Sequence, residues 1–250
     1  MADSTPLKVT LYTYFRSSCS ARLRIALNLK SIPYTPIAVN LLKGEQSSPE
    51  NITLNPSGTV PTLIVEHPSK GPVTITQSLA ALEYLEEISP ASSHTLLPPA
   101  SDPEARAVVR TLAHIMSCDV QPVTNLRILK RVAPFGVDRA AWSKDLIEDG
   151  FRAYEAIAVK SAGLFSVGDS ITMADVCLLP AVWGAERAGV KVEDFPTIYR
   201  VAQQLEEEDA VRRAHWRTQP DTPEEFRLSS SWDKASMCAR LDVNIDSSAH

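Results

Sequence analysis

Three serines and a cysteine occur together near the N-terminus, at Ser17, Ser18, Cys19 and Ser20. They lie between a strand-like and a helix-like segment, where a helix leaves its first backbone N–H groups unpaired and its dipole favours negative charge. Hydroxyl donors at such a position lower the pKa of a bound thiol by stabilising its charged form. The structural alternative is that the serines only cap the helix.

Cys19 is itself a candidate nucleophile. The Cys-x-x-Cys spacing of dithiol redox proteins would need a cysteine at position 16 or 22, and both positions hold arginine. Dithiol redox chemistry is therefore disfavoured. A single-thiol reaction that passes through a mixed disulfide stays a competing hypothesis, because Cys19 shares the same helix start.

Two further elements have groups that would bind a short peptide. An X-Pro bond such as Val60–Pro61 can adopt the cis form at a low cost in free energy. A cis bond leaves the N–H and C=O of the preceding residue free to pair with an extended peptide. Gln77 and Ser78 begin a later helix and offer an amide, a hydroxyl and helix N–H groups to a carboxylate. The structural alternatives are a trans proline at a strand start and simple helix capping.

The elements around these residues indicate a small mixed sheet flanked by helices, as in thioredoxin, because a strand–helix–strand unit is followed by a hairpin and a helix. Hydrophobic periodicity predicts, in order, a strand at 9–14, a helix at 21–30, an edge strand at 34–40, a polar loop, a strand from 62, a strand at 73–76 and a helix from 78.

From residue 102 onward the pattern is helical. Asp102-Pro103-Glu104 starts a helix that Pro122 should kink, helices follow at 140–159 and 196–208, and Thr172 with Asp175 forms a capping box. We therefore predict an α/β thioredoxin-like N-terminal domain at 1–89, a linker at 90–101, an all-α domain at 102–227 and a poorly ordered tail at 228–250.

Composition narrows the class of partner. The 250 residues are 44% hydrophobic and 22% charged, with a net charge of −5, and no block of basic residues offers the positive surface that nucleic acid needs. No stretch is long and apolar enough to span a membrane. The four cysteines are widely spread, without metal-site spacing. We expect a cytoplasmic protein with reduced thiols, no metal, no nucleic acid and no membrane partner.

The segments YFRSSCS, LNPSGTVPTL, TQSLAALEYLEE and TMADVCLLP follow one another along the chain, and QPDTP occurs near its end. This combination resembles the glutathione transferase family, and the form SSCS-x-R-x-R-I-A-L resembles its zeta class. The resemblance covers residues 7–227. It implies the glutathione transferase fold and a second-substrate site in the helical domain.

The resemblance also implies roles for individual residues. The residues implied for catalysis are Ser17, Ser18 and Cys19, with Ser18 as the first choice of hydrogen-bond donor to the glutathione thiol. Those implied for glutathione binding are Gln46, Val60, Pro61, Gln77, Ser78, Gln121 and Asn125, the last two approaching the second site. Those implied for an acidic substrate are Arg16, Arg22 and Arg187. Two departures from the class pattern are Ala21, where tryptophan is frequent, and Arg127, where a small polar residue is common.

The activity implied by the resemblance is glutathione-dependent cis–trans isomerisation of maleylacetoacetate to fumarylacetoacetate, by thiolate addition and elimination, in phenylalanine and tyrosine breakdown. Transferase activity on α-halo acids and a homodimer are implied as well. Two alternatives stay open: a glutathione thioltransferase that uses Cys19, and a non-catalytic binding module that keeps only the fold.

Overall fold

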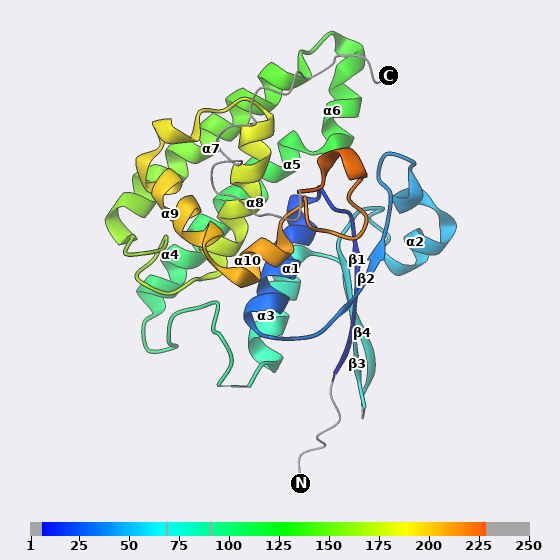
Figure 1. The fold of residues 1–250 in the computed structure, drawn as a ribbon, viewed down its shortest axis with the longest axis horizontal. Coiled ribbons are helices and arrows are strands. Elements are labelled where there is room, and N and C mark those ends of the chain that lie inside the picture. The colour runs from blue at the N-terminus through cyan, green and yellow to red at the C-terminus, as the bar shows by residue number, and fades with distance from the viewer. Residues whose placement is uncertain (1–6, 69, 91, 229–250) are drawn as a thin grey trace.

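The computed structural model describes residues 7–68, 70–90 and 92–228. A four-stranded sheet lies at one side of the molecule, and the helices that follow it in sequence gather at the other side (Figure 1). None of the described helices has the length and apolar character needed to cross a membrane. The predicted tail, apart from Leu228, lies outside the described residues.

The sheet has the strand order β2-β1-β3-β4. Its strands are β1 (Lys8–Thr13), β2 (Thr35–Ala38), β3 (Thr62–His67) and β4 (Gly71–Ile75). β1 pairs in parallel with β2 and antiparallel with β3, which pairs antiparallel with β4. Val9, Leu11, Leu63 and Val65 alternate along β1 and β3 and are buried in the core. This mixed sheet, with β2 at its edge, confirms the thioredoxin-like prediction.

The helix after β1 begins earlier than predicted. α1 (Ser18–Leu29) has Ser17 as its N-cap, and the Ser17 hydroxyl oxygen accepts a hydrogen bond from the N–H of Ser20 at 3.2 Å. The predicted start at Ala21 was therefore wrong, because the serine cap moves the first turn upstream. As a result Ser18 and Cys19 lie in the first turn of α1. The helix α3 (Ser78–Ile88) begins as predicted.

The segment predicted as a polar loop after β2 contains helical structure, so that prediction was wrong in part. A 3₁₀ turn (Glu45–Ser47) is followed by α2 (Pro49–Leu54). The Ser48 side chain accepts from the N–H of Asn51, and Pro49 occupies the first helical position, where its missing N–H costs nothing. In Figure 1, α2 lies on the side of the sheet away from the other helices.

The helical half contains seven α-helices within the described residues. They are α4 (Pro103–His114), α5 (Gln121–Thr124), α6 (Leu126–Val132), α7 (Arg139–Ser161), α8 (Met173–Arg187), α9 (Pro196–Glu206) and α10 (Asp209–Ala214), with a π-helical segment at Ile115–Val120 and short 3₁₀ turns at Ala133–Phe135, Val192–Asp194 and Glu224–Phe226. The π-helical segment immediately precedes α5, which has Pro122 in its first turn, so the distortion expected from that proline lies just before it.

α8 is the buried central helix of this half and contacts α1, α4 and α9. Its capping box is confirmed: the Asp175 carboxylate accepts from the N–H of Thr172 at 2.7 Å and from its hydroxyl at 2.9 Å. The same carboxylate accepts from the N–H of Ser166 at 2.8 Å. Burial raises the pKa of Asp175, and these hydrogen bonds oppose that increase. The cap therefore holds the start of α8 in one place.

After α10, residues 215–226 turn back toward the loop that joins β1 to α1; we call them the closing segment. The Asp221 carboxylate accepts from the N–H of Phe15 at 2.8 Å, across 206 positions of sequence. Within the segment, the Thr222 hydroxyl donates to the carbonyl of Trp216 at 2.7 Å and the Gln219 amide donates to the carbonyl of His215 at 2.8 Å. The end of the described chain is thus tied to the start of the fold.

A buried arginine, Arg24 in α1, holds this junction together. Its guanidinium donates to the hydroxyl of Thr13 at 2.9 Å, to the carbonyls of Tyr14 and Phe15 at 3.4 and 3.1 Å, and to the carbonyl of Ala214 at 3.1 Å. A planar five-donor group can serve four oxygens at once, and a lysine ammonium cannot reach them in the same geometry.

We predict that Arg24→Lys lowers the free energy of unfolding by about 2–4 kcal/mol, because buried acceptors lose their donors. Urea denaturation would measure the loss. Arg152→Lys is the matched control, since the Arg152 side chain is 59% exposed and should change stability by less than about 0.5 kcal/mol. Equal stability of the two variants would contradict the prediction.

Candidate active site

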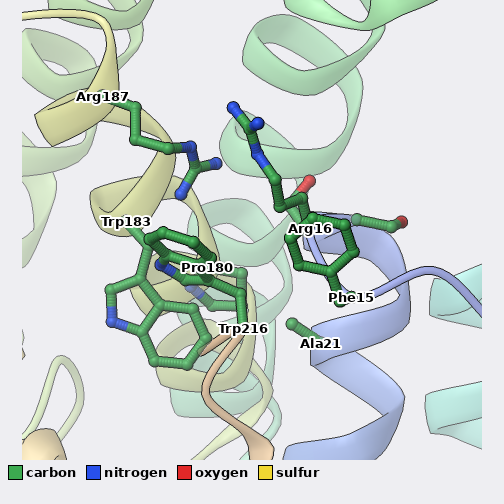
Figure 2. Close-up of a pocket in the computed structure, with 9 residues that line it drawn as sticks. Phe15, Arg16, Ala21, Pro180, Trp183, Arg187 and Trp216 are labelled. Carbon is green, nitrogen blue, oxygen red and sulfur yellow. The ribbon is translucent and has the colours of Figure 1, made fainter. Parts of the chain in front are cut away.

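A pocket that is open to solvent lies between the start of α1 and the C-terminal part of α8. Figure 2 shows its walls, which come from the β1–α1 loop, from α8 and from the closing segment. The lining residues are Phe15, Arg16, Ser17, Ser18, Ala21, Pro180, Trp183, Arg187 and Trp216. The pocket therefore combines hydroxyl groups, two guanidinium groups and an apolar wall.

The two guanidinium groups, of Arg16 and Arg187, extend toward each other across the pocket (Figure 2). Nη1 of Arg187 is buried and has no hydrogen-bond partner among the described residues. Burial, together with the nearby charges of Arg16 and Arg217, lowers the pKa of Arg187 to about 10 against the opposing charge of Glu186, so the group still carries its charge at neutral pH. A buried cation without a partner is costly, and a carboxylate would relieve that cost.

The hydroxyl side of the pocket belongs to the first turn of α1. Ser17 lines the pocket, but its oxygen already accepts the capping hydrogen bond from Ser20. Ser18 lines the pocket and its hydroxyl makes no hydrogen bond within the described part of the chain, so it is the better placed donor. Cys19 is half-buried and does not line the pocket; its Sγ lies 3.7 Å from Nη1 of Arg22.

Arg22 was predicted to bind substrate, but the structure does not bring it to the pocket. It is buried behind the first turn of α1, where Nη1 donates to the hydroxyl of Ser78 at 3.1 Å and Nη2 donates to the carbonyl of Met116 at 3.3 Å. These contacts connect the start of α3 with the π-helical segment of the helical half. Arg22 is therefore placed to position Ser78 and Cys19.

The residues predicted to hold a short peptide have free polar groups. Oε1 of Gln46 is buried without a partner among residues 7–68, 70–90 and 92–228. The Val60–Pro61 bond is cis, and the N–H and C=O of Val60 form no hydrogen bond with described residues. Gln77 is the N-cap residue of α3 but makes no side-chain capping bond, so its amide is also available beside the helix N-terminus. This donor and acceptor set suits an extended acidic peptide.

Gln121 and Asn125 do not line the pocket. The Asn125 side chain caps α6: its oxygen accepts from the N–H of Ile128 at 3.0 Å, and its nitrogen donates to the carbonyl of Pro122 at 2.9 Å. Both of its polar atoms are therefore used in local structure. Gln121 begins α5 immediately after the π-helical segment.

Sequence reasoning did not assign Phe15, Pro180, Trp183 and Trp216 to the site. Trp183 is held in place by Glu206, whose carboxylate accepts from the indole N–H at 3.1 Å, and burial raises the pKa of Glu206 to about 7. The available signal was a tryptophan at position 216, separated by two residues from the QPDTP stretch that begins at Gln219. Ala21, noted as a departure from the zeta pattern, lies on the α1 side of this pocket.

Comparisons with known proteins agree with this architecture. Residues 16–88 match the family of the glutathione S-transferase N-terminal domain. Maleylacetoacetate isomerase maiA of Aspergillus fumigatus is 93% identical over 231 residues, which cover 92% of this chain and 100% of that protein.

Two solved structures share the fold. The holo structure of maleyl pyruvate isomerase, a bacterial glutathione S-transferase in the zeta class, superposes with a TM-score of 0.78 at 40% identity and covers 86% of this chain and 100% of its own. Maleylacetoacetate isomerase from Anaeromyxobacter dehalogenans, with bound dicarboxyethyl glutathione and citrate, has a TM-score of 0.77 at 35% identity, over 87% of this chain and 99% of its own. The chain belongs to the glutathione transferase family and, within it, to the zeta class.

Proposed function

We propose that this chain catalyses the glutathione-dependent isomerisation of maleylacetoacetate to fumarylacetoacetate. The observation that carries the proposal is the pocket in which Ser18, at the N-terminus of α1, lies near the guanidinium groups of Arg16 and Arg187. The relative from Aspergillus fumigatus is named for this activity, and the enzyme from Anaeromyxobacter dehalogenans binds a dicarboxyethyl derivative of glutathione.

The chain has groups that suit glutathione, a short peptide with two carboxylates. Val60 offers an unpaired N–H and C=O to the cysteinyl unit beside Pro61. Gln77, Ser78 and the N-terminus of α3 offer donors to the γ-glutamyl carboxylate, and Gln46 has an unused amide oxygen. We propose these residues as the glutathione site. We propose Gln121 and Asn125 only for the outer edge of the glutathione site, because neither residue lines the pocket.

When bound, glutathione supplies the thiolate that adds to the cis double bond and leaves after rotation about the resulting single bond; with an α-halo acid, the same nucleophile displaces halide. Ser18 donates a hydrogen bond that stabilises the anionic sulfur, helped by the N-terminal dipole of α1. Arg16 and Arg187 hold the carboxylates of the substrate. Ser17 keeps the first turn of α1 in place through its capping bond.

We expect purified protein to isomerise maleylacetone, the stable analogue of maleylacetoacetate, only when glutathione is present. The reason is that the described residues that line the pocket offer hydroxyl and guanidinium groups but no thiol. Absorbance of the substrate would follow the reaction with and without glutathione. Retention on immobilised glutathione without turnover of any substrate would instead favour a binding module.

A Cys19 thioltransferase is the second candidate function, favoured by the position of Cys19 at the start of α1 with its sulfur 3.7 Å from Arg22. It differs from the first in which side chain is indispensable. Ser18 is needed in the isomerase, whereas Cys19 is needed in the thioltransferase.

We predict that Ser18→Ala lowers kcat/KM for isomerisation by about 100-fold at neutral pH, the usual cost of one donor to a reacting anion. Loss of the donor raises the pKa of the bound thiol, so activity should recover in part as pH rises through that higher value. Steady-state rates against pH would measure both effects. Cys19→Ser is the matched variant. If Cys19→Ser abolishes glutathione-dependent activity while Ser18→Ala does not, the chain is a thioltransferase and the isomerase proposal is wrong.

We also propose that the chain forms a homodimer in the cytoplasm, on the basis of its membership of this family. The helical half of such enzymes commonly supports the pairing of two subunits. Sedimentation equilibrium should therefore return twice the 27.4 kDa of one chain. A single-chain mass at micromolar concentration would contradict the homodimer.

A further inference from the structure

The arginines of the pocket rest on aromatic rings that belong to the closing segment. Cζ of Arg187 lies 5.3 Å from the centre of the Trp216 ring, and Cζ of Arg16 lies 5.8 Å from the centre of the Phe226 ring. Arg217 also lies over Trp216, at 4.9 Å. Each distance is within the range at which a cation is attracted to the face of an aromatic ring.

We propose that Trp216 and Phe226, which we call the aromatic shelf, are positioning residues that hold Arg187 and Arg16 in register for the carboxylates of a dicarboxylate substrate. This inference rests on the proposed isomerase function and deepens it by naming what sets substrate selectivity. The shelf acts through the arginines, although the Trp216 ring also forms part of the pocket wall.

The shelf is built rigidly. Phe15 packs against both rings, with centroid distances of 6.4 Å to Trp216 and 6.5 Å to Phe226, and the two shelf rings are 6.1 Å apart. The hydrogen bond from Phe15 N–H to Asp221 and the bond from the Thr222 hydroxyl to the Trp216 carbonyl tie the backbone in place. A cation that rests on these rings is therefore held at a defined position.

The arginines need such a support because Nη1 of Arg187 has no hydrogen-bond partner among the described residues, although the charge of Glu186 attracts this guanidinium. Arg16 and Arg187 carry like charges that repel each other, and Arg16 is exposed on its loop. A long side chain loses conformational entropy when it is fixed, so a free arginine would move into solvent. Resting on an aromatic face offsets that loss before the substrate arrives, which is the advantage of preorganisation.

The surroundings of the shelf keep the positive charge in the pocket. His215 is buried between Trp183 and Trp216, with ring centroids 4.6 and 5.6 Å away. Burial, together with the charges of Arg217, Arg187 and Arg24, lowers the pKa of His215 to about 3, so its ring is neutral at physiological pH. The cations that line the pocket within the described residues are thus Arg16 and Arg187.

Trp216→Leu and Phe226→Leu test the proposal because each removes one ring face and keeps an apolar side chain. For each variant we expect KM for maleylacetoacetate, which carries both carboxylates, to rise by about 3- to 30-fold, the range that corresponds to one cation–π contact, with a smaller change in kcat. KM for glutathione should not change. Phe135→Leu is the matched control, since Phe135 is 83% exposed and does not line the pocket.

The conservative variant Trp216→Phe separates positioning from mere packing. It retains an aromatic face for Arg187, so KM for maleylacetoacetate should return close to that of the unmodified protein. The shelf is refuted if Trp216→Phe is as impaired as Trp216→Leu, if the Leu variants leave KM for maleylacetoacetate unchanged, or if they raise KM for glutathione equally. Thermal unfolding of each variant, recorded in parallel, identifies a loss that comes from unfolding alone, which also counts against the shelf.

Binding of maleate to the glutathione-saturated protein, measured by calorimetry, distinguishes failure of the shelf from failure of the isomerase. If the unmodified protein binds maleate and the Leu variants bind it more weakly by a similar factor, the shelf stands even when maleylacetone is not turned over. If maleate binds equally well to the unmodified protein and the Leu variants, or to neither, the shelf is wrong while isomerase turnover is judged separately.

Discussion

The buried guanidinium of Arg24 is the interaction on which the site depends. Burial lowers its pKa to about 10, with Tyr34 and Asp221 opposing the decrease, so the group stays charged in the interior. A buried charge is tolerated only when its donors are used, and the oxygens of Thr13, Tyr14, Phe15 and Ala214 use them. One side chain thus joins the end of β1 to the end of α10.

That junction brings together the three parts of the pocket. The loop after β1 carries Arg16 and leads into Ser17 and Ser18, α8 carries Arg187, and the closing segment begins directly after Ala214. Each part contributes a different kind of group: hydroxyls and helix N–H groups, guanidiniums, and aromatic rings. The site that we propose for a thiolate and for carboxylates combines these groups in a chain whose net charge is negative.

Much of the fold was predictable because its signals are local. Alternation predicted β1, the apolar run after Pro61 predicted β3, and the Thr172–Asp175 capping box predicted the start of α8. The errors were local as well. The start of α1 was placed too late because apolar residues at helical spacing begin only at Ala21, whereas the first turn is polar. The short helix α2 was missed although Ser48-Pro49-Glu50 is a good helix start, because so short a helix has little periodicity to detect.

The sequence by itself determined the fold class and the family, since these follow from short-range patterns and motif order. Only the tertiary structure decided which arginines face the pocket. Arg16 and Arg22 are six positions apart, yet one lines the pocket and the other is buried against Ser78 and Met116. The same holds for Trp216 and Phe226, about 200 positions from the loop they support. Contacts over such separations depend on how the whole chain packs, and no local pattern encodes them.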